Sequence, residues 1–190
     1  MRHVRFAALI AACAIGCSGC GWSPYGGGHA TASGSGAVAP ACRPAQLHVS
    51  LGPFISPATG QNPRALRIRN SGRPCVLTGY PTLHFIDRRG HAIPFEISHH
   101  GDQMVTDAPP APVRLARGGS AWVVMNRYRC DLGDRRMVRR TVFGVFGTHQ
   151  GLWLVVPRQA AWAYCGPGDP GSTVAVSPFE PRLAASLSHK

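Results

Sequence analysis

Lysine and acidic residues are scarce in this chain of 190 residues. The sequence has 20 Lys and Arg against 8 Asp and Glu, a formal net charge of +12, and Lys190 is its only lysine. Charged residues make up 15% of the chain and hydrophobic residues 44%. This composition excludes a chain that is disordered throughout and indicates one globular domain with short appendages.

Long helical patterns are also missing from the sequence. The chain holds 23 glycines and 17 prolines, which interrupt helices and favour turns. A helical bundle is therefore excluded, and short strands joined by frequent turns are expected.

No apolar run is long enough to cross a bilayer. The run at residues 6–15 follows Arg2 and Arg5, and as a helix it would span only about 15 Å, half of a hydrocarbon core. A basic start followed by a short apolar run is typical of an export signal. We expect residues 1–19 to be a signal peptide.

Small residues lead into cysteine after this run, in the order Gly16-Cys17-Ser18-Gly19-Cys20. The pattern resembles a bacterial lipoprotein signal, in which the Cys thiol receives a diacylglyceryl group before cleavage. Cys20 has the best local context and Cys17 is the alternative, whereas Cys13 would shorten the apolar run. Acyl chains such as palmitate would hold the protein at the extracytoplasmic face of the cell membrane. A freely secreted protein is the alternative.

Residues 20–41 are rich in Gly, Ala and Ser and have no strand or helix periodicity, so they are expected to form a flexible tether. A tether of this length has a root-mean-square reach of about 25 Å. The expected domain then covers residues 42–180, and residues 181–190 form a C-terminal tail.

Apolar and polar residues alternate repeatedly from Cys42 onward, the pattern of half-buried strands. Turn signals rich in Gly, Pro and Asn separate the alternating segments. About eight or nine short strands near ten residues apart predict an all-β fold, an antiparallel β-sandwich. The clearest segments are 47–51, 66–69, 83–85, 93–97, 121–125, 142–146, 152–156 and 174–176.

Four cysteines lie in the expected domain, and an even number in an exported protein indicates disulfides. Three pairings are possible; we favour Cys42 with Cys75 and Cys130 with Cys165, since each pair links neighbouring strand regions. None of these four cysteines belongs to a Cys-x-x-Cys pair, which disfavours a metal site at these residues.

The run from Asn70 to Pro81, which contains Cys75-Val76-Leu77-Thr78-Gly79-Tyr80-Pro81, is the most distinctive stretch. It resembles the hallmark of an actinobacterial secreted and lipoprotein family catalogued as domain of unknown function four-two-three-two. Further matches over about residues 42–178 are Cys42, Leu47, Leu83, Phe85, Asp87, Gly90, the segment 113–121, Cys130, Pro157 and Cys165.

The resemblance implies a compact, all-β, immunoglobulin-like domain outside the cell and no active site. The sequence departs from the family at Arg117, where proline is usual, and at Asn126 and Arg127, where a second tryptophan or similar residue is frequent. Within the hallmark, Gly79, Tyr80 and Pro81 are expected to form a structural corner: glycine tolerates positive φ, the tyrosine ring can be buried, and proline fixes the exit direction.

Motifs of catalysis are missing from the sequence: it has no nucleophile elbow, zinc-protease motif, phosphate loop or dinucleotide fingerprint. The segment His99-His100-Gly101-Asp102, with His91 upstream, could in principle ligate a metal, but a solvated polar loop is the favoured interpretation. We therefore expect no catalytic residues, no metal and no cofactor.

Arginine is the remaining signal, because a strongly basic surface attracts polyanions and guanidinium groups suit phosphate. Candidate anion-binding residues are Arg67, Arg69, Arg127, Arg129 and Arg139. Outside a membrane their partners would be anionic lipids, phosphorylated glycans or acidic proteins, and no nucleic acid is expected. A solvated basic surface without a ligand fits the composition equally.

The sequence thus predicts a lipid-anchored, non-catalytic binding or interaction module of the cell envelope. The alternatives are a structural envelope domain without a small ligand and an unrecognised extracellular enzyme. The oligomeric state stays open.

Overall fold

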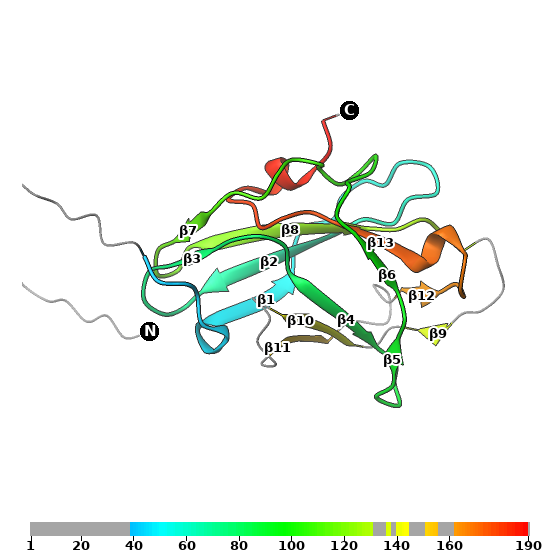
Figure 1. Ribbon diagram of the computed structural model, residues 1–190, viewed down its shortest axis with the longest axis horizontal. Helices are drawn as coiled ribbons and strands as arrows, with labels where there is room; N and C mark the ends of the chain where they lie inside the picture. The colour runs from blue at the N-terminus through cyan, green and yellow to red at the C-terminus, as the bar shows by residue number, and fades with distance from the viewer. Residues whose placement is uncertain (1–38, 131–135, 138–139, 145–150, 156–161, 190) are drawn as a thin grey trace, which may run out of the picture. The chain divides into compact units, whose positions relative to one another are not determined.

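The computed structural model describes residues 39–130, 136–137, 140–144, 151–155 and 162–189 (Figure 1). The expected signal peptide, the lipidation candidates Cys20 and Cys17, most of the tether and Arg139 lie outside these residues. In the part of the chain that the structure describes, no helix is long and apolar enough to cross a membrane.

The fold is all-β. Its helical segments among the described residues are short 3₁₀ turns, η1 (Pro44–Gln46), η3 (Pro170–Ser172) and η4 (Leu183–Ser186). The strands are β1 (Leu47–Leu51), β2 (Arg64–Asn70), β3 (Cys75–Leu77), β4 (Thr82–Ile86), β5 (Ala92–Ile93), β6 (Glu96–Ser98), β7 (Val113–Leu115), β8 (Ser120–Asn126), β9 (Arg136–Met137), β10 (Arg140–Gly144), β11 (Gly151–Val155), β12 (Ala163–Tyr164) and β13 (Thr173–Val176).

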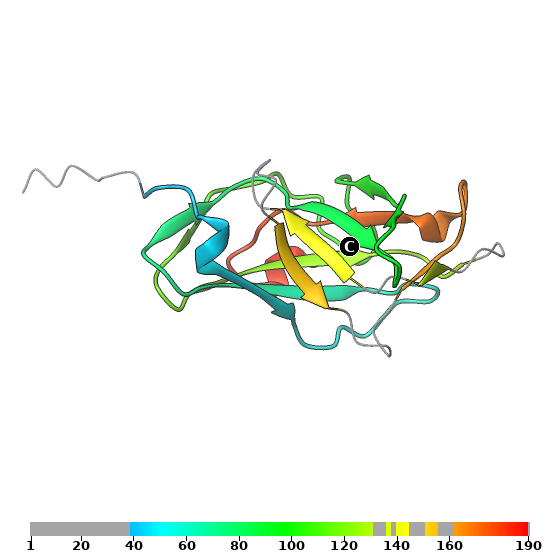
Figure 2. The ribbon, with the colours of Figure 1, turned by 90° about the horizontal axis from the view of Figure 1, so that it is seen from below.

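Two larger sheets organise these strands. One has five strands in the order β1-β2-β8-β13-β6, and the other has four in the order β11-β10-β4-β5. Figure 2 shows β10, β11 and β4 in front of the five-stranded sheet when the domain is seen from below. Two small sheets, β3-β7 and β12-β9, complete the strand pairing of the described residues.

Alternation along β2 explains how the sheet faces the core. Leu66 and Ile68 are fully buried, while Arg67 and Arg69 between and beyond them are exposed. The antiparallel register sets Leu66 opposite Val123 and Ile68 opposite Ala121 of β8. Each buried aliphatic side chain contributes about 1.5–3 kcal/mol relative to an exposed one.

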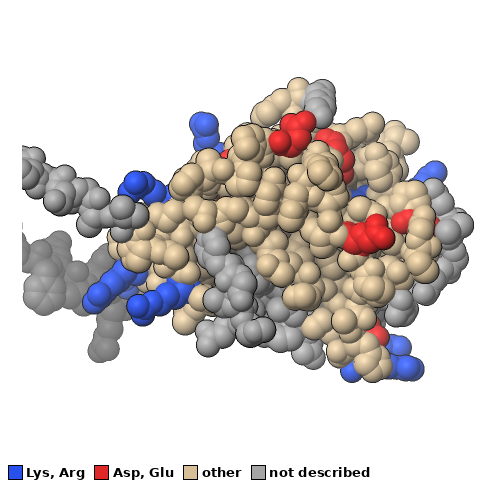
Figure 3. All heavy atoms as spheres, in the orientation of Figure 1, with Lys and Arg blue, Asp and Glu red and all other residues tan. Residues whose placement is uncertain are grey.

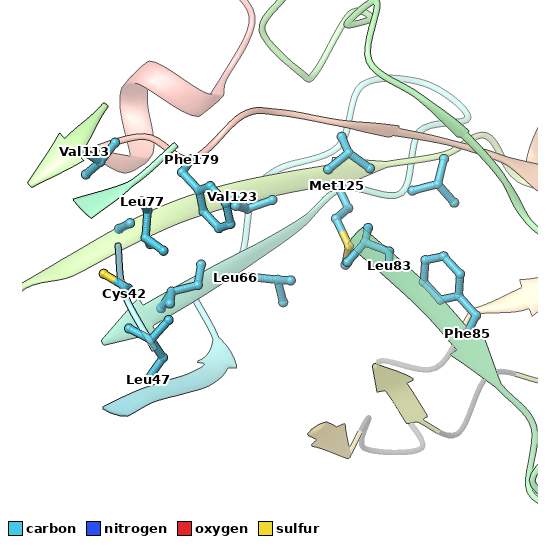
Figure 4. Close-up of a cluster of buried hydrophobic side chains, with 14 of the residues drawn as sticks. Cys42, Leu47, Leu66, Leu77, Leu83, Phe85, Val113, Val123, Met125 and Phe179 are labelled. Atoms are coloured by element: carbon cyan, nitrogen blue, oxygen red, sulfur yellow. The ribbon is translucent and has the colours of Figure 1, made fainter. Parts of the chain in front are cut away.

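The main core lies between the two larger sheets and draws residues from both. Figure 4 shows Leu66, Val123 and Met125 of the five-stranded sheet with Leu83 and Phe85 of β4. The fully buried ring of Phe179, from the segment after β13, belongs to the same cluster. The two sheets therefore share one core.

A second, smaller cluster covers the opposite face of the five-stranded sheet. It consists of Val105, Val124 and Ala175, with Met104 and Leu187 packed against it. Since Val123 and Val124 point to opposite faces of β8 and both are fully buried, the sheet is covered on both sides at β8.

The structure differs from the sequence-based expectation in two respects. First, β6 runs parallel to β13, with Glu96 opposite Thr173, so the sheet is mixed and not purely antiparallel. Second, the described residues hold more strands than the eight or nine expected. The segment 93–97 is divided between β5 and β6 because Pro94 has no backbone N–H to donate to a sheet, and several strands have only two or three residues.

Two disulfides link the described cysteines, Cys42 with Cys75 and Cys130 with Cys165. These are the pairs that the sequence analysis favours. They close loops with sequence separations of 33 and 35 residues, so each tethers a different half of the domain.

The Gly79-Tyr80-Pro81 corner lies between β3 and β4. Gly79 has a φ of +79°, in the left-handed region that favours glycine, and its carbonyl accepts a hydrogen bond from the backbone N–H of Phe179 at 3.0 Å. The half-buried Tyr80 ring stacks on His99 with 4.0 Å between ring centroids, and Pro81 is buried. The corner thus joins β4 to the chain segment that follows β13.

Candidate functional site

Three chain segments meet at the end of the domain that carries the small β3-β7 sheet. The backbone N–H of Cys42 donates to the carbonyl of Val76 at 3.0 Å, which binds the start of the described chain to β3. The loop after β2 is held by Ser71, whose N–H donates to Gln46 at 2.8 Å. The loop between β7 and β8 is held by Gly118, whose N–H donates to the carbonyl of Asn70 at 2.7 Å.

The buried side chain of Asn70 connects the same segments. Its amide nitrogen Nδ2 lies 2.9 Å from the carbonyl oxygen of Arg73, 3.3 Å from that of Leu115 and 3.2 Å from that of Ala116. Its Oδ1 accepts hydrogen bonds from the backbone of Gly72 and from the side chain of Gln46. Asparagine suits this position because one side chain supplies both donors and an acceptor.

Five exposed arginines lie on the segments that meet at this end of the domain, and we call this group the arginine end. Its members are Arg43, Arg69, Arg73, Arg114 and Arg117. The segments that carry them, residues 39–47, 69–76 and 113–120, contain no Asp or Glu. In Figure 3 blue spheres gather at the end of the domain that bears β3 and β7 in Figure 1, and most of the visible red spheres lie away from it.

A pocket of about 240 Å³ lies within the arginine end. It is lined by Arg43, Arg73, Gln46 and the Cys42-linked Cys75, together with Pro40, Ala41 and Pro74. Its volume is below that of a typical drug-sized site, so it fits a small group such as a phosphate better than a large ligand.

The arginine end is electrostatically unbalanced. The ion pair found among the described residues lies outside the arginine end. It joins Nδ1 of His91 to Oδ2 of Asp87 at 3.6 Å, in the turn between β4 and β5. The described carboxylates belong to other segments: Asp87, Glu96, Asp102, Asp107, Asp169 and Glu180. Among the described residues, the segments of the arginine end thus carry positive charge without a carboxylate.

A family model described as Domain of unknown function (DUF4232) matches residues 42–180 of the chain. The chain belongs to this family. No curated protein and no solved structure matches it. All five members of the arginine end lie within the part of the DUF4232 domain that the family model covers.

The arginines singled out from the sequence do not form one site in this DUF4232 domain. Arg67 and Arg69 project from the exposed face of β2; the Arg67 Nε donates to the Ser120 hydroxyl at 2.9 Å and its guanidinium lies 5.8 Å from the Trp122 ring. Arg129 is exposed, and Arg139 lies outside the described residues. Arg69 alone of the set belongs to the arginine end.

Arg127 differs from Arg67, Arg69 and Arg129 because it is buried. Its side chain is only 5% exposed, and its Nη1 donates to the carbonyl of Gly171 at 2.7 Å and lies 3.0 Å from Sγ of Cys165. The structure thus places Arg127 inside the domain and not on its basic surface, and the pattern of charges along the sequence does not reveal this burial.

Arg43 and Arg73 are absent from the sequence-based set, although a signal for them exists. Arg43 follows Cys42 and Arg73 precedes Cys75 by two residues, so the favoured disulfide already implies that these two arginines are neighbours. Charge counts alone do not reveal this, whereas the covalent link does.

A larger hollow of about 450 Å³ lies elsewhere in the DUF4232 domain, beside β6 and η3. Its carboxylates have structural partners: Asp169 accepts from the Gly171 N–H at 2.8 Å, and Glu96 accepts from the Thr173 hydroxyl at 3.3 Å. Prolines form much of the rest of its lining. The arrangement stabilises the η3 turn.

The histidine segment considered for metal binding also has structural roles. His99 stacks on Tyr80, and Asp102 accepts backbone hydrogen bonds from Met104 and Val105 as well as one from the Asn126 amide at 2.6 Å. Within the described part of the chain, no group of three or more His, Cys, Asp or Glu side chains is placed to hold a metal ion.

Proposed function

We propose that this protein is a lipid-anchored, non-catalytic binding module of the cell envelope. Its acyl anchor is on Cys20, and its arginine end binds the phosphate groups of anionic lipids in the membrane that carries the anchor. The observation that supports this proposal is the group Arg43, Arg69, Arg73, Arg114 and Arg117, all exposed and on segments without a carboxylate.

The position of the arginine end along the chain favours the lipid surface over a distant partner. The described domain begins at this end, since Ala41 pairs with Val76 and Cys42 is bonded to Cys75. A tether attached here gives the arginines the shortest path to the anchored membrane. Guanidinium groups present several donors in one plane and match phosphate oxygens.

The expected affinity suits a tethered domain. A basic residue near an anionic membrane contributes about 1 kcal/mol, so five arginines contribute at most about 5 kcal/mol, which is a dissociation constant near 0.2 mM. A short flexible tether supplies an effective concentration on the order of 1 mM. The domain therefore docks reversibly when anchored and binds weakly when released.

At the level of the fold, we propose an immunoglobulin-like sandwich. The support is the single core that the five-stranded and four-stranded sheets share, with Leu66 and Val123 from one and Leu83 and Phe85 from the other.

The anchor is tested by Cys20→Ser in the full chain, followed by membrane fractionation of the producing cells. We expect the variant to leave the membrane fraction and to lack an acyl modification in its intact mass. A variant that keeps both the acyl group and its membrane location would refute Cys20 as the anchor, and Cys17→Ser would then be tested in the same way.

Lipid binding is tested with a chain of residues 21–190, which has no acyl group and contains every described residue of the domain. Co-sedimentation is measured with vesicles of phosphatidylcholine and with vesicles that also contain phosphatidylglycerol. We expect binding to the anionic vesicles at low salt, and its loss as the ionic strength shortens the Debye length to about 8 Å. Equal binding to both vesicles, or none to either, would contradict the proposal.

A further inference from the structure

The two disulfides of the domain have different surroundings. Cys42 and Cys75 are 5% and 2% exposed, and the neutral amide of Gln46 lies 2.9 Å from Sγ of Cys75. In the other disulfide, Cys165 is fully buried while Cys130 is half-buried and follows the exposed Tyr128 and Arg129. An external thiol therefore has its better approach at Cys130.

A buried cation lies beside the inner sulfur of this second disulfide. Nη1 of Arg127 is 3.0 Å from Sγ of Cys165 and 3.9 Å from Sγ of Cys130. The guanidinium also lies 5.7 Å from the centre of the Trp162 ring, and its Nε is buried without a hydrogen-bond partner. A disulfide sulfur is only a weak acceptor, so Cys165 adds little to the hydrogen bond that the carbonyl of Gly171 accepts from Nη1 at 2.7 Å.

Burial disfavours the charged form of the Arg127 guanidinium. Burial lowers the pKa of Arg127 to about 10, and the carboxylate of Asp169 acts in the opposite direction. A negative charge on Cys165 would add to the attraction that Asp169 already provides, because attraction between opposite charges is strong in a site screened from water. Guanidinium groups beside a cysteine lower the pKa of its thiol by the same effect.

We propose that Cys130–Cys165 is a thiol-exchange site, at which an external low-molecular-weight thiol or a dithiol protein forms a mixed disulfide with Cys130. The attacking thiolate bonds to Sγ of Cys130, the bond between Cys130 and Cys165 breaks, and its electron pair leaves on Sγ of Cys165. The resulting thiolate is stabilised by Arg127. A second thiolate attacks the external sulfur of the mixed disulfide, which releases the external disulfide and the Cys130 thiolate.

The direction of attack follows from both features together. A sulfur that departs as a stabilised thiolate departs faster, and the sulfur that is attacked must be reachable. Cys165 is the stabilised sulfur and Cys130 the reachable one. Arg43 and Arg73 line the pocket beside Cys42–Cys75, but among the described residues no guanidinium donates a hydrogen bond to either of its sulfurs, and both of its cysteines are buried. We therefore expect it to stay oxidised under the same conditions.

The test uses the full chain with Cys13, Cys17 and Cys20 replaced by serine, so that only the four domain cysteines react. The folded protein is exposed to reduced glutathione, quenched with acid and alkylated, and each cysteine is quantified by peptide mass spectrometry. We expect Cys130–Cys165 to open at least roughly tenfold faster than Cys42–Cys75, with glutathione attached to Cys130. Equal rates, or glutathione on Cys165, would overturn the proposal.

Single substitutions of Arg127 test whether its positive charge, and not only the accessibility of Cys130, determines the rate of opening. Arg127→Gln is expected to slow opening by roughly tenfold, Arg127→Lys to restore most of the rate, and the exposed Arg129→Gln to leave it unchanged. An Arg127→Gln protein that opens as fast as the parent would contradict the role of the guanidinium. If Arg127→Gln fails to fold, the location of glutathione on the parent chain still decides the direction of attack. In concentrated denaturant the two disulfides should open at similar rates.

Discussion

The side-chain amide of Asn70 donates a hydrogen bond to the backbone carbonyl of Leu115, 45 residues further along the chain. The same nitrogen also reaches Arg73 and Ala116, so one buried side chain holds the loop after β2 against the loop after β7. Both loops carry members of the arginine end. Asn70 is thus the residue that links the core of the domain to the proposed lipid-binding surface.

Replacing Asn70 is expected to destabilise the domain strongly. Asn70→Ala removes the donor to the buried carbonyl of Leu115 and to the partly buried carbonyls of Arg73 and Ala116, at a cost of about 2–4 kcal/mol. Urea unfolding followed by circular dichroism measures this loss. Asn62→Ala is the matched control, because the hydrogen bonds of Asn62 come from its backbone nitrogen. Equal midpoints for the two variants would contradict the linking role of Asn70.

The two disulfides should contribute similar stability but different effects on lipid binding. Their sequence separations of 33 and 35 residues correspond to about 3–4 kcal/mol each in the chain-entropy treatment. Replacing Cys42 and Cys75 by alanine also frees Arg43 from Arg73, so binding to anionic vesicles should fall. Replacing Cys130 and Cys165 should lower the unfolding midpoint and leave the vesicle affinity of the folded domain unchanged. Vesicle sedimentation below the unfolding midpoint separates the two outcomes.

Protonation of His99 should destabilise the domain at mildly acidic pH. His99 is exposed at the surface, but partial desolvation of its ring where it stacks on Tyr80, with a smaller contribution from His100, lowers its pKa. The unfolded chain then binds more protons than the folded one, so this contribution is present above the ordinary histidine value of about 6.5 and is lost as the pH falls below it. His99→Phe retains an aromatic stack and removes the titration. Comparing urea midpoints at about pH 7.5 and pH 5.5 should show a smaller drop for the variant than for the parent. Equal drops would refute this assignment.

Any side chain at position 79 should lower the stability of the domain, because the backbone there has a positive φ. A Cβ at this position meets nothing within 4 Å, so the cost of Gly79→Ala comes from its φ of +79° alone. We expect a loss of about 1–2 kcal/mol for alanine and less for asparagine, which visits the left-handed region more readily. Thermal unfolding of the two variants provides the comparison. A stability for Gly79→Ala equal to that of the parent would show that the corner relaxes.

Local patterns in the sequence predicted the parts of the fold that depend on neighbouring residues. Alternation located β1, β2, β4 and β8 to within two residues, because a half-buried strand repeats every second residue. It did not identify β3 or β7 as strands, because three residues give too little alternation to separate a strand from a loop.

The site depends on contacts that are distant along the chain. Arg69 could be placed on an exposed strand face from alternation alone. The neighbours of Asn70 come from loops more than forty residues away, and no local pattern indicates them. Arg127 shows the same limit, since its burial depends on Cys165 and Gly171. The cysteine pairing was the long-range information available in the sequence, and it brings Arg43 and Arg73 together.

Two charge-matched variants of the chain of residues 21–190 test the arginine end most directly. In the first, the five members of the arginine end become glutamine. In the second, five arginines that are exposed elsewhere in the described part of the chain become glutamine: Arg67, Arg88, Arg89, Arg129 and Arg182. Both variants lose the same net charge. The measurement is the partition coefficient on phosphatidylglycerol-containing vesicles at low salt. We predict a loss of at least about tenfold for the first variant and less than about threefold for the second; equal losses would show that net charge alone drives binding and would contradict a lipid-binding site at the arginine end.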